Sequence, residues 1–245
     1  MKENIKIYIE KDYNAASQRA CDLFVKKVKM YPAGAFGFAT GSTPIGLYKE
    51  LVMLSDEKKL DLSKITAFNL DEYHPIKKDD TQSYAYFMAK NLFDAVKLPK
   101  ENRNMPNGEA INAFEECRRY DEKLAKSGGI KLQILGLGLN GHIGFNEPGN
   151  DFSRSTNYAK LSDDTINANA RFFRNADDVP KYAITMGIRT IMMAEEILLI
   201  VSGGSKAKIL KDALTGPITP MVPASALQLH RNVNVVIDQE AGKLL

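Results

Sequence analysis

Short apolar runs alternate with longer segments of helical period along the chain, and this alternation limits the possible folds more than any other feature. Six runs carry the β-branched and aromatic residues typical of strands: 5–9, 36–39, 65–70, 132–137, 197–201 and 233–237. They are nearly all apolar, as strands covered on both faces are. The pattern predicts an α/β fold, a three-layer α/β/α sandwich with a mostly parallel, Rossmann-like sheet.

Apolar residues recur at helical spacing between these runs. Seven segments show this period: 15–30, 44–54, 83–93, 110–126, 163–170, 181–193 and 205–214. The stretch 141–160 shows neither period and is rich in Gly, Asn, Ser and Asp, so it predicts a long functional loop. Because no repeat, low-complexity tract or long linker divides the sequence, we expect a single domain over residues 1–245.

Composition argues against several classes of protein. The net charge of +3 comes from 33 basic and 30 acidic residues without a basic run that would follow a nucleic-acid backbone. The apolar run 197–201 is far shorter than the roughly 20 residues that cross a bilayer. Cys21 and Cys117 lack CxxC spacing, and no secretory leader is recognisable. We expect a cytoplasmic protein without nucleic-acid or membrane partners.

Two polar motifs are candidate anion sites, because ligands of open α/β sheets bind beyond the carboxyl ends of the strands. The run 36–39 leads into Gly41, Ser42 and Thr43, which offer a flexible backbone and two hydroxyls at the start of a helix. An ordinary helix N-cap is the alternative. Lys206 follows the run 197–201 and a glycine turn, a position suited to a phosphate, although a surface charge is the alternative.

Neither nucleotide fingerprint is completed. Gly41 and Gly46 are not followed by the Lys and Ser/Thr of a P-loop. The glycines at 136, 138 and 141 satisfy GxGxxG, but glycine and proline follow where the dinucleotide motif needs a helix. The sequence therefore implies no nucleotide.

Acidic and imidazole side chains also follow predicted strands. Asp71 and Glu72 come after the run 65–70 with side chains that point differently, so one of them is a candidate general base and a solvated acidic loop is the alternative. His142 lies among glycines, where packing gives little reason for it, and Glu147 is near enough to orient its imidazole for acid-base catalysis. A metal site built from His142, Glu147 and Asp71 is a further alternative, without the usual ligand spacing to support it.

The motifs together resemble the glucosamine-6-phosphate deaminase family (glucosamine/galactosamine-6-phosphate isomerases). The matching stretches are ATGSTP at 39–44, FNLDEY at 68–73, GLNGHIGFNEP at 138–148, ARFF at 170–173 and ALQLH at 226–230. The resemblance covers nearly the whole chain, and the third motif is long and specific. It implies conversion of D-glucosamine 6-phosphate into D-fructose 6-phosphate and ammonia in N-acetylglucosamine catabolism, with no cofactor.

The resemblance also implies roles for individual residues. Asp71 resembles the family's base, which moves the C2 proton of the open-chain sugar to C1 through an enolamine. His142 resembles the residue that opens the pyranose ring, and Glu147 resembles the carboxylate partner of that histidine. A phosphate clamp is implied for five residues: Gly41, Ser42, Thr43, Arg171 and Lys206. Taken without the resemblance, Arg171 and Lys206 would each be read as surface charges.

Two departures from the family pattern carry expectations. Asn140 stands where many members have aspartate, and its amide can hold the histidine without supplying charge, so we expect an altered pH dependence. The loop 153–160 does not clearly match the cations with which allosteric hexameric relatives bind N-acetylglucosamine 6-phosphate, and the sequence stops at Leu245. We expect a non-allosteric monomer or small homo-oligomer with a small sugar phosphate as its substrate.

Two other functions are compatible with this architecture. A 6-phosphogluconolactonase has the same fold and a phosphate site, and a non-catalytic sugar-phosphate sensor has the same kind of domain. The combination of the 71–73 motif with the loop 142–147 favours the deaminase. A sensor that regulates transcription would also need a DNA-binding helix-turn-helix, for which the sequence leaves no room.

Overall fold

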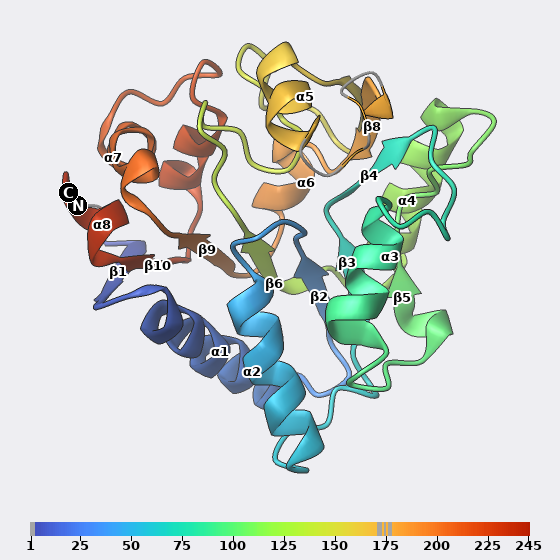
Figure 1. Ribbon diagram of the computed structural model, residues 1–245, viewed down its shortest axis with the longest axis horizontal. Coiled ribbons are helices and arrows are strands. Elements are labelled where there is room, and N and C mark those ends of the chain that lie inside the picture. Colours follow the sequence, from blue (N-terminus) through green and yellow to red (C-terminus); the bar gives the residue numbers. More distant parts are fainter. Residues whose placement is uncertain (1–2, 171–172, 174, 176–177) are drawn as a thin grey trace.

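The computed structural model describes residues 3–170, 173, 175 and 178–245 (Figure 1). Within these residues, seven strands form one sheet in the order β1-β10-β9-β6-β2-β3-β5, and every neighbouring pair is parallel. The strands are β1 (Ile5–Glu10), β2 (Ala35–Phe38), β3 (Thr66–Asn69), β5 (Arg103–Asn104), β6 (Ile130–Leu135), β9 (Ile197–Val201) and β10 (Val233–Asp238). The predicted α/β fold with a mostly parallel sheet is confirmed.

Helices cover both faces of this sheet. In Figure 1, α1 and α2 lie below the row of strands, and α6 and α7 lie above it. The helices are α1 (Tyr13–Met30), α2 (Ile45–Asp56), α3 (Tyr84–Met88), α4 (Ala113–Lys126), α5 (Asp163–Ala170), α6 (Ile188–Met192), α7 (Ala207–Thr215) and α8 (Gln239–Gly242). None of the helices in the described ranges is long and apolar enough to span a membrane.

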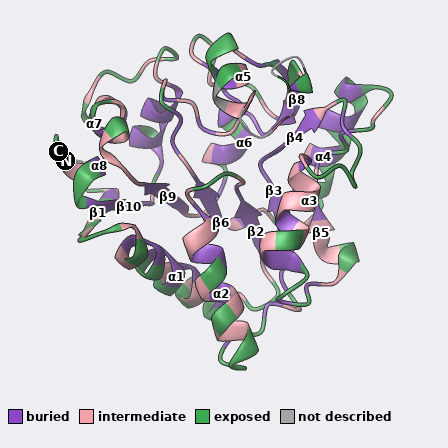
Figure 2. Ribbon diagram, in the orientation of Figure 1, coloured by how far each residue is buried: buried purple, intermediate pink, exposed green. Residues whose placement is uncertain are grey.

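The core lies between the sheet and its helices, and α1 shows how the sequence builds it. The helix begins after Asp12, whose carboxylate accepts a hydrogen bond from the Ala15 amide at 2.8 Å. It buries Phe24 with ring centroids 5.2 Å from Phe36 and 5.7 Å from Phe38 on β2. Each such buried side chain contributes roughly 1.5–3 kcal/mol. Figure 2 shows the strands buried while the outer faces of α1 and α2 are exposed.

A second, antiparallel sheet was not predicted. Its strands follow the order β4-β8-β7 and span Asp71–His74, Tyr182–Thr185 and Asn157–Lys160. The prediction of a helix over 181–193 was therefore wrong at its start, because α6 begins only after Gly187. The predicted loop 141–160 likewise ends in β7. Pairing with two neighbours outweighs local helical spacing for the aromatic and β-branched residues of β8.

Boundaries moved in two further places. The predicted strand 132–137 is β6, which ends two residues earlier, before Gly136. The predicted helix 83–93 is α-helical only to Met88 and continues as a π-helical turn over Ala89–Phe93.

The small sheet stands at the carboxyl end of the main sheet. Strand β4 begins two residues after β3 ends, with Leu70 between them. The Met186 amide, just past β8, donates a hydrogen bond to the Leu70 carbonyl at 2.7 Å. The two sheets are thus joined at the edge where α/β proteins bind ligands.

Candidate active site

Asp71, the first residue of β4, is a buried carboxylate, with 5% of its surface exposed. Burial, followed by the neighbouring charge of Glu72, raises the pKa of Asp71 to about 8. Within the described ranges, no side chain or amide donates a hydrogen bond to its carboxylate. The group is therefore poised to exchange a proton near neutral pH.

Glu72 has a different role from its neighbour. Its carboxylate accepts hydrogen bonds from the amides of Tyr73 at 3.0 Å, Tyr84 at 2.8 Å and Ala85 at 2.8 Å. Burial raises the pKa of Glu72 to about 7 although these bonds oppose the shift. Because Glu72 anchors the start of α3, Asp71 is the carboxylate of this pair that is free for chemistry.

An aromatic cluster lies beside Asp71. The Tyr73 ring centroid is 4.8 Å from that of Tyr84 and 5.6 Å from that of Phe145, and the Tyr84 and Phe145 rings stack at 5.9 Å. The Tyr84 side chain also interacts with Thr40, in the loop after β2. The structure thus brings the loops after β2, β3 and β6 together around Asp71, as parallel strands that end at one edge should.

Gly144 lets the loop after β6 approach Asp71. Its φ of +57° lies in the left-handed region, and a Cβ placed on it would lie 3.5 Å from Asp71 Oδ2 and 3.0 Å from Thr185 Oγ1. The Phe145 amide donates to Thr185 Oγ1 at 3.1 Å, and Asn146 Nδ2 donates to the Met186 carbonyl at 2.8 Å. These bonds to the end of β8 hold the loop in place.

His142 and Glu147 are brought together as the sequence predicted. His142 Nδ1 lies 3.7 Å from Glu147 Oε2, within ion-pair range and longer than a hydrogen bond. Asn140 Nδ2 donates to the same Oε2 at 2.8 Å, and Asn140 Oδ1 accepts from the His142 amide at 3.1 Å. Asn140 therefore holds the histidine by a hydrogen bond, as the sequence suggested, but through the His142 backbone amide, and it also bonds to the carboxylate.

Glu147 is held by more donors than the sequence revealed. Its Oε1 accepts a hydrogen bond of 2.5 Å from the hydroxyl of Thr165, in the first turn of α5. Burial raises the pKa of Glu147, but the interactions with His142, Thr165 and Asn140 outweigh burial and lower the pKa to about 2. The carboxylate stays ionised at neutral pH. Sequence reasoning missed Thr165, whose position at a predicted helix start was its only signal.

Gly138 makes room for the imidazole. A Cβ on Gly138 would lie 2.4 Å from three ring atoms of His142, closer than any real contact. The Gly138 amide donates to the His142 carbonyl at 2.9 Å. A glycine is needed here because the ring lies against the backbone.

The described candidate phosphate residues lie on two loops, one after β2 and one after β9, and β6 lies between these two strands in the sheet. Gly41 has a φ of +101°, and a Cβ there would meet nothing within 4 Å. The side chains of Ser42 and Thr43 do not cap α2, whose first-turn amide at Gly46 instead donates to the Tyr13 hydroxyl at 2.8 Å. Lys206 is half-buried, and its Nζ donates to the Leu137 carbonyl at 2.6 Å. Burial lowers the pKa of Lys206. Arg171 lies outside the described residues.

The other two histidines have structural surroundings. His230 Nε2 contacts the Ala194 carbonyl at 2.9 Å, and its Nδ1 accepts from the Asn232 amide at 3.0 Å. His74 Nε2 contacts the Ala110 carbonyl at 2.8 Å. Among the residues that the structure describes, no three His, Cys, Asp or Glu side chains are grouped as metal ligands.

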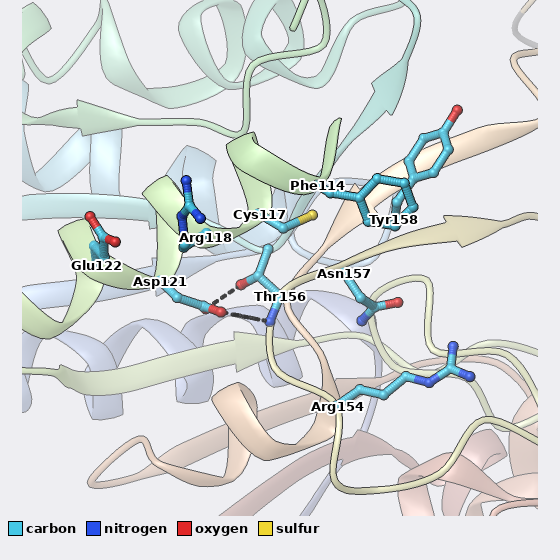
Figure 3. Close-up of a pocket in the computed structure, with 9 residues that line it drawn as sticks. All are labelled: Phe114, Cys117, Arg118, Asp121, Glu122, Arg154, Thr156, Asn157 and Tyr158. Atoms are coloured by element: carbon cyan, nitrogen blue, oxygen red, sulfur yellow. Dashed lines mark hydrogen bonds between the residues drawn. The ribbon is translucent and has the colours of Figure 1, made fainter. Parts of the chain in front are cut away.

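A surface pocket lies apart from these residues, between α4 and the segment that leads into β7 (Figure 3). Asp121 accepts hydrogen bonds from the Thr156 hydroxyl at 2.5 Å and amide at 3.1 Å, and Arg118 and Arg154 also line the pocket. A second pocket is bordered by residues of the loop after β4, including Gln82. Neither is lined by a described residue of the predicted site.

Known proteins are similar to this chain over nearly its whole length. The family model described as glucosamine-6-phosphate isomerases/6-phosphogluconolactonase matches residues 12–237. A glucosamine-6-phosphate deaminase of Clostridium perfringens (strain SM101 / Type A) is 48% identical over 98% of this chain and 100% of its own length. A solved monomeric glucosamine-6-phosphate deaminase superposes with a TM-score of 0.95 at 42% identity, over 98% of this chain and 100% of that one.

A more distant likeness concerns the fold alone. The 6-phosphogluconolactonase of Leishmania guyanensis superposes with a TM-score of 0.77 at 19% identity, over 97% of each chain. The chain belongs to the glucosamine-6-phosphate isomerase/6-phosphogluconolactonase family and, within it, groups with the glucosamine-6-phosphate deaminases.

Proposed function

We propose that this protein is an enzyme that converts D-glucosamine 6-phosphate and water into D-fructose 6-phosphate and ammonia. The observation that carries the proposal is the pair of carboxylates with opposite pKa shifts: Asp71 at the start of β4, and Glu147 in the loop after β6, which approaches Asp71 at Gly144. Two titratable groups whose surroundings push their pKa values apart are typical of acid-base catalysis. The relatives at 42–48% identity are named for this activity.

In the proposed first step, His142 takes the proton of the C1 hydroxyl and delivers it to the ring oxygen, so that the bond between C1 and the ring oxygen breaks and the pyranose opens to the aldehyde. Glu147, ionised and 3.7 Å from Nδ1, stabilises the imidazole while it carries the proton. Asn140 fixes this carboxylate through its 2.8 Å hydrogen bond.

In the proposed second step, the Asp71 carboxylate removes the C2 proton, the C–H electron pair forms the C1–C2 double bond of an enolamine, and the C1 carbonyl pair moves to O1, which takes up a proton from solvent. Asp71 then returns the proton to C1, which leaves an imine at C2. Water adds to this imine and ammonia leaves, giving the ketone. A base with a pKa of about 8 suits both directions of the transfer, because its two protonation states are close in free energy near pH 8.

The phosphate is proposed to bind at the loop of Gly41, Ser42 and Thr43, with Lys206 and Arg171 as its cations. The hydroxyls of Ser42 and Thr43, which make no capping bond to α2, and the half-buried ammonium of Lys206 support this assignment. Since the phosphate is remote from C1 and C2, its binding positions the reacting carbons.

The setting of the reaction is part of the same proposal. We place it in N-acetylglucosamine catabolism, in a cytoplasmic enzyme built as one domain over residues 1–245. The family match over 12–237, nearly the whole chain, supports the single domain.

The test is ammonia release from glucosamine 6-phosphate by the purified protein, followed together with fructose 6-phosphate. Asp71→Asn should abolish release, and Asp56→Asn, which removes an exposed carboxylate at the end of α2, should leave it unchanged. A sample treated with chelator should remain active. Hydrolysis of 6-phosphogluconolactone without ammonia release would instead identify a lactonase, and binding of the sugar phosphate without turnover would identify a sensor.

A further inference from the structure

Thr165 is a buried threonine in the first turn of α5, and its hydroxyl reaches across to the loop after β6. The residue is 5% exposed, and Oγ1 lies 2.5 Å from Glu147 Oε1. A hydroxyl donating to an ionised carboxylate makes a strong, charge-assisted hydrogen bond. Thr165 is thus the link between Glu147 and α5.

The hydroxyl of Thr165 is itself oriented by Ser162. The Ser162 hydroxyl donates to Thr165 Oγ1 at 3.1 Å, and the Thr165 amide donates to Ser162 Oγ at 3.2 Å. With Ser162 as donor, the Thr165 proton points to Glu147. Hydrogen bonds in such a chain polarise and strengthen one another.

We propose that Thr165 is a positioning residue, which holds Glu147 in the orientation that presents Oε2 to His142 and so couples the place of α5 to the acid-base pair. Thr165 fixes Oε1 from α5, while Asn140 fixes Oε2 from the loop. A carboxylate held through both oxygens by two separate elements cannot turn away from Nδ1. This inference rests on the proposed function.

The surroundings of Glu147 make the effect measurable. In the described structure, the groups that face its carboxylate are His142 and Asn140 from its own loop and Thr165, backed by Ser162, from α5. The two acidic residues in the first turn of α5, at 163 and 164, are exposed to solvent. Loss of the Thr165 hydroxyl should therefore change the pKa of Glu147 directly.

The experiment compares Thr165→Val, which keeps the shape and removes the hydroxyl, with Thr165→Ser, which restores the hydroxyl. Thr190→Val is the matched control, because Thr190 is also buried in a helix but its hydroxyl lies 3.4 Å from Asp121. Kinetics of ammonia release across pH give kcat and KM. The pKa of Glu147 is read by 13C NMR of labelled glutamate carboxyls, with the signal assigned by its absence in Glu147→Gln.

We expect Thr165→Val to lower kcat about tenfold with little change in KM, and to raise the pKa of Glu147 by about one unit. Thr165→Ser should lie within threefold of the wild type. Equal effects of Thr165→Val and Thr190→Val, or failure of Thr165→Ser to restore kcat, would overturn the inference. If the wild type releases no ammonia, the proposed function fails, and an unchanged Glu147 pKa in Thr165→Val then rejects the inference separately.

Discussion

Asp71, the first residue of β4, and Glu147, in the loop after β6, are two carboxylates whose surroundings shift their pKa values in opposite directions. Both are buried, yet the pKa of Asp71 rises to about 8 while that of Glu147 falls to about 2. Glu147 has hydrogen-bond donors on both oxygens and an imidazole 3.7 Å away. Asp71 has no donor among the described residues and lies next to the charge of Glu72. The comparison shows that donors, rather than burial, decide which carboxylate can accept a proton near neutral pH.

Removing the Asp71 charge should have the largest effect. Asp71→Asn should lower kcat by about 10³-fold or more, because the amide cannot take the C2 proton. It should also stabilise the fold. Since the folded pKa of about 8 lies above the ordinary value of 3.8, ionisation of Asp71 opposes folding increasingly as pH rises from about 4 to 8.

Urea unfolding of Asp71→Asn and the wild type from pH 5 to 8 measures this second effect. The gain in unfolding free energy should grow with pH and reach roughly 2–4 kcal/mol near pH 7. A variant that stays active, or that is less stable than the wild type throughout this range, would contradict the assigned role of Asp71.

Glu147→Gln should show the opposite change in stability. One amide cannot accept from both Asn140 and Thr165, so a buried donor loses its partner at a cost of about 1–3 kcal/mol. Because the folded pKa of Glu147 is about 2, its stabilisation is complete above its ordinary value of 4.5 and is lost as pH falls from there toward 2. We expect kcat to fall about 100-fold.

Thermal unfolding at pH 7 and at pH 4 tests this prediction. Wild type and Glu147→Gln should differ clearly at pH 7, and the difference should begin to shrink at pH 4. A difference that is constant, or that grows on acidification, would mean that the Glu147 carboxylate is not the stabilising group.

Six of the seven strands of the main sheet could be predicted from the sequence, whereas its two-residue edge strand β5 and the small sheet could not. Strands β9 and β10 are buried throughout, and their residues are apolar except Asn234 and Asp238 of β10. Strands β4, β7 and β8 have four residues each and mix charged, polar and aromatic side chains. The pairing of β4 with β8 joins residues more than 100 positions apart, and no local pattern encodes such a contact.

The same limit applied to the candidate site. His142 and Glu147 could be paired from sequence because they are close along the chain. Which of Asp71 and Glu72 is free depended on where α3 begins, since its first amides bind Glu72. The contact of Thr165 with Glu147 depended in turn on the position of α5. Both contacts depend on the tertiary structure and cannot be predicted from the spacing of residues in the sequence.

A smaller effect is expected from adding one carbon beside the imidazole. In Gly138→Ala, the new Cβ would overlap the His142 ring at 2.4 Å, so the ring must move and kcat should fall roughly 10- to 100-fold. Gly136→Ala is the comparison, because a Cβ there meets no atom within 4 Å. Steady-state kinetics of both variants would separate the cases, and equal losses would rule out ring displacement as the cause.

The smallest effect is expected at Asn140. Replacing this residue with aspartate removes one hydrogen-bond donor from Glu147 and so makes the surroundings of Glu147 more like those of Asp71. Asn140→Asp replaces the 2.8 Å donor to Glu147 with a second negative charge, which raises the pKa of Glu147. We expect the pH–rate profile to move up by about 0.5 to 1 unit, with the maximal rate changed only a few-fold. Asn150→Asp adds the same charge farther along this loop, where the backbone amide alone bonds to Glu147, so its profile should match the wild type. Superimposable profiles for wild type and Asn140→Asp would show that the amide does not tune the acid-base pair, and the contrast between Asp71 and Glu147 would then rest on Thr165 and His142 alone.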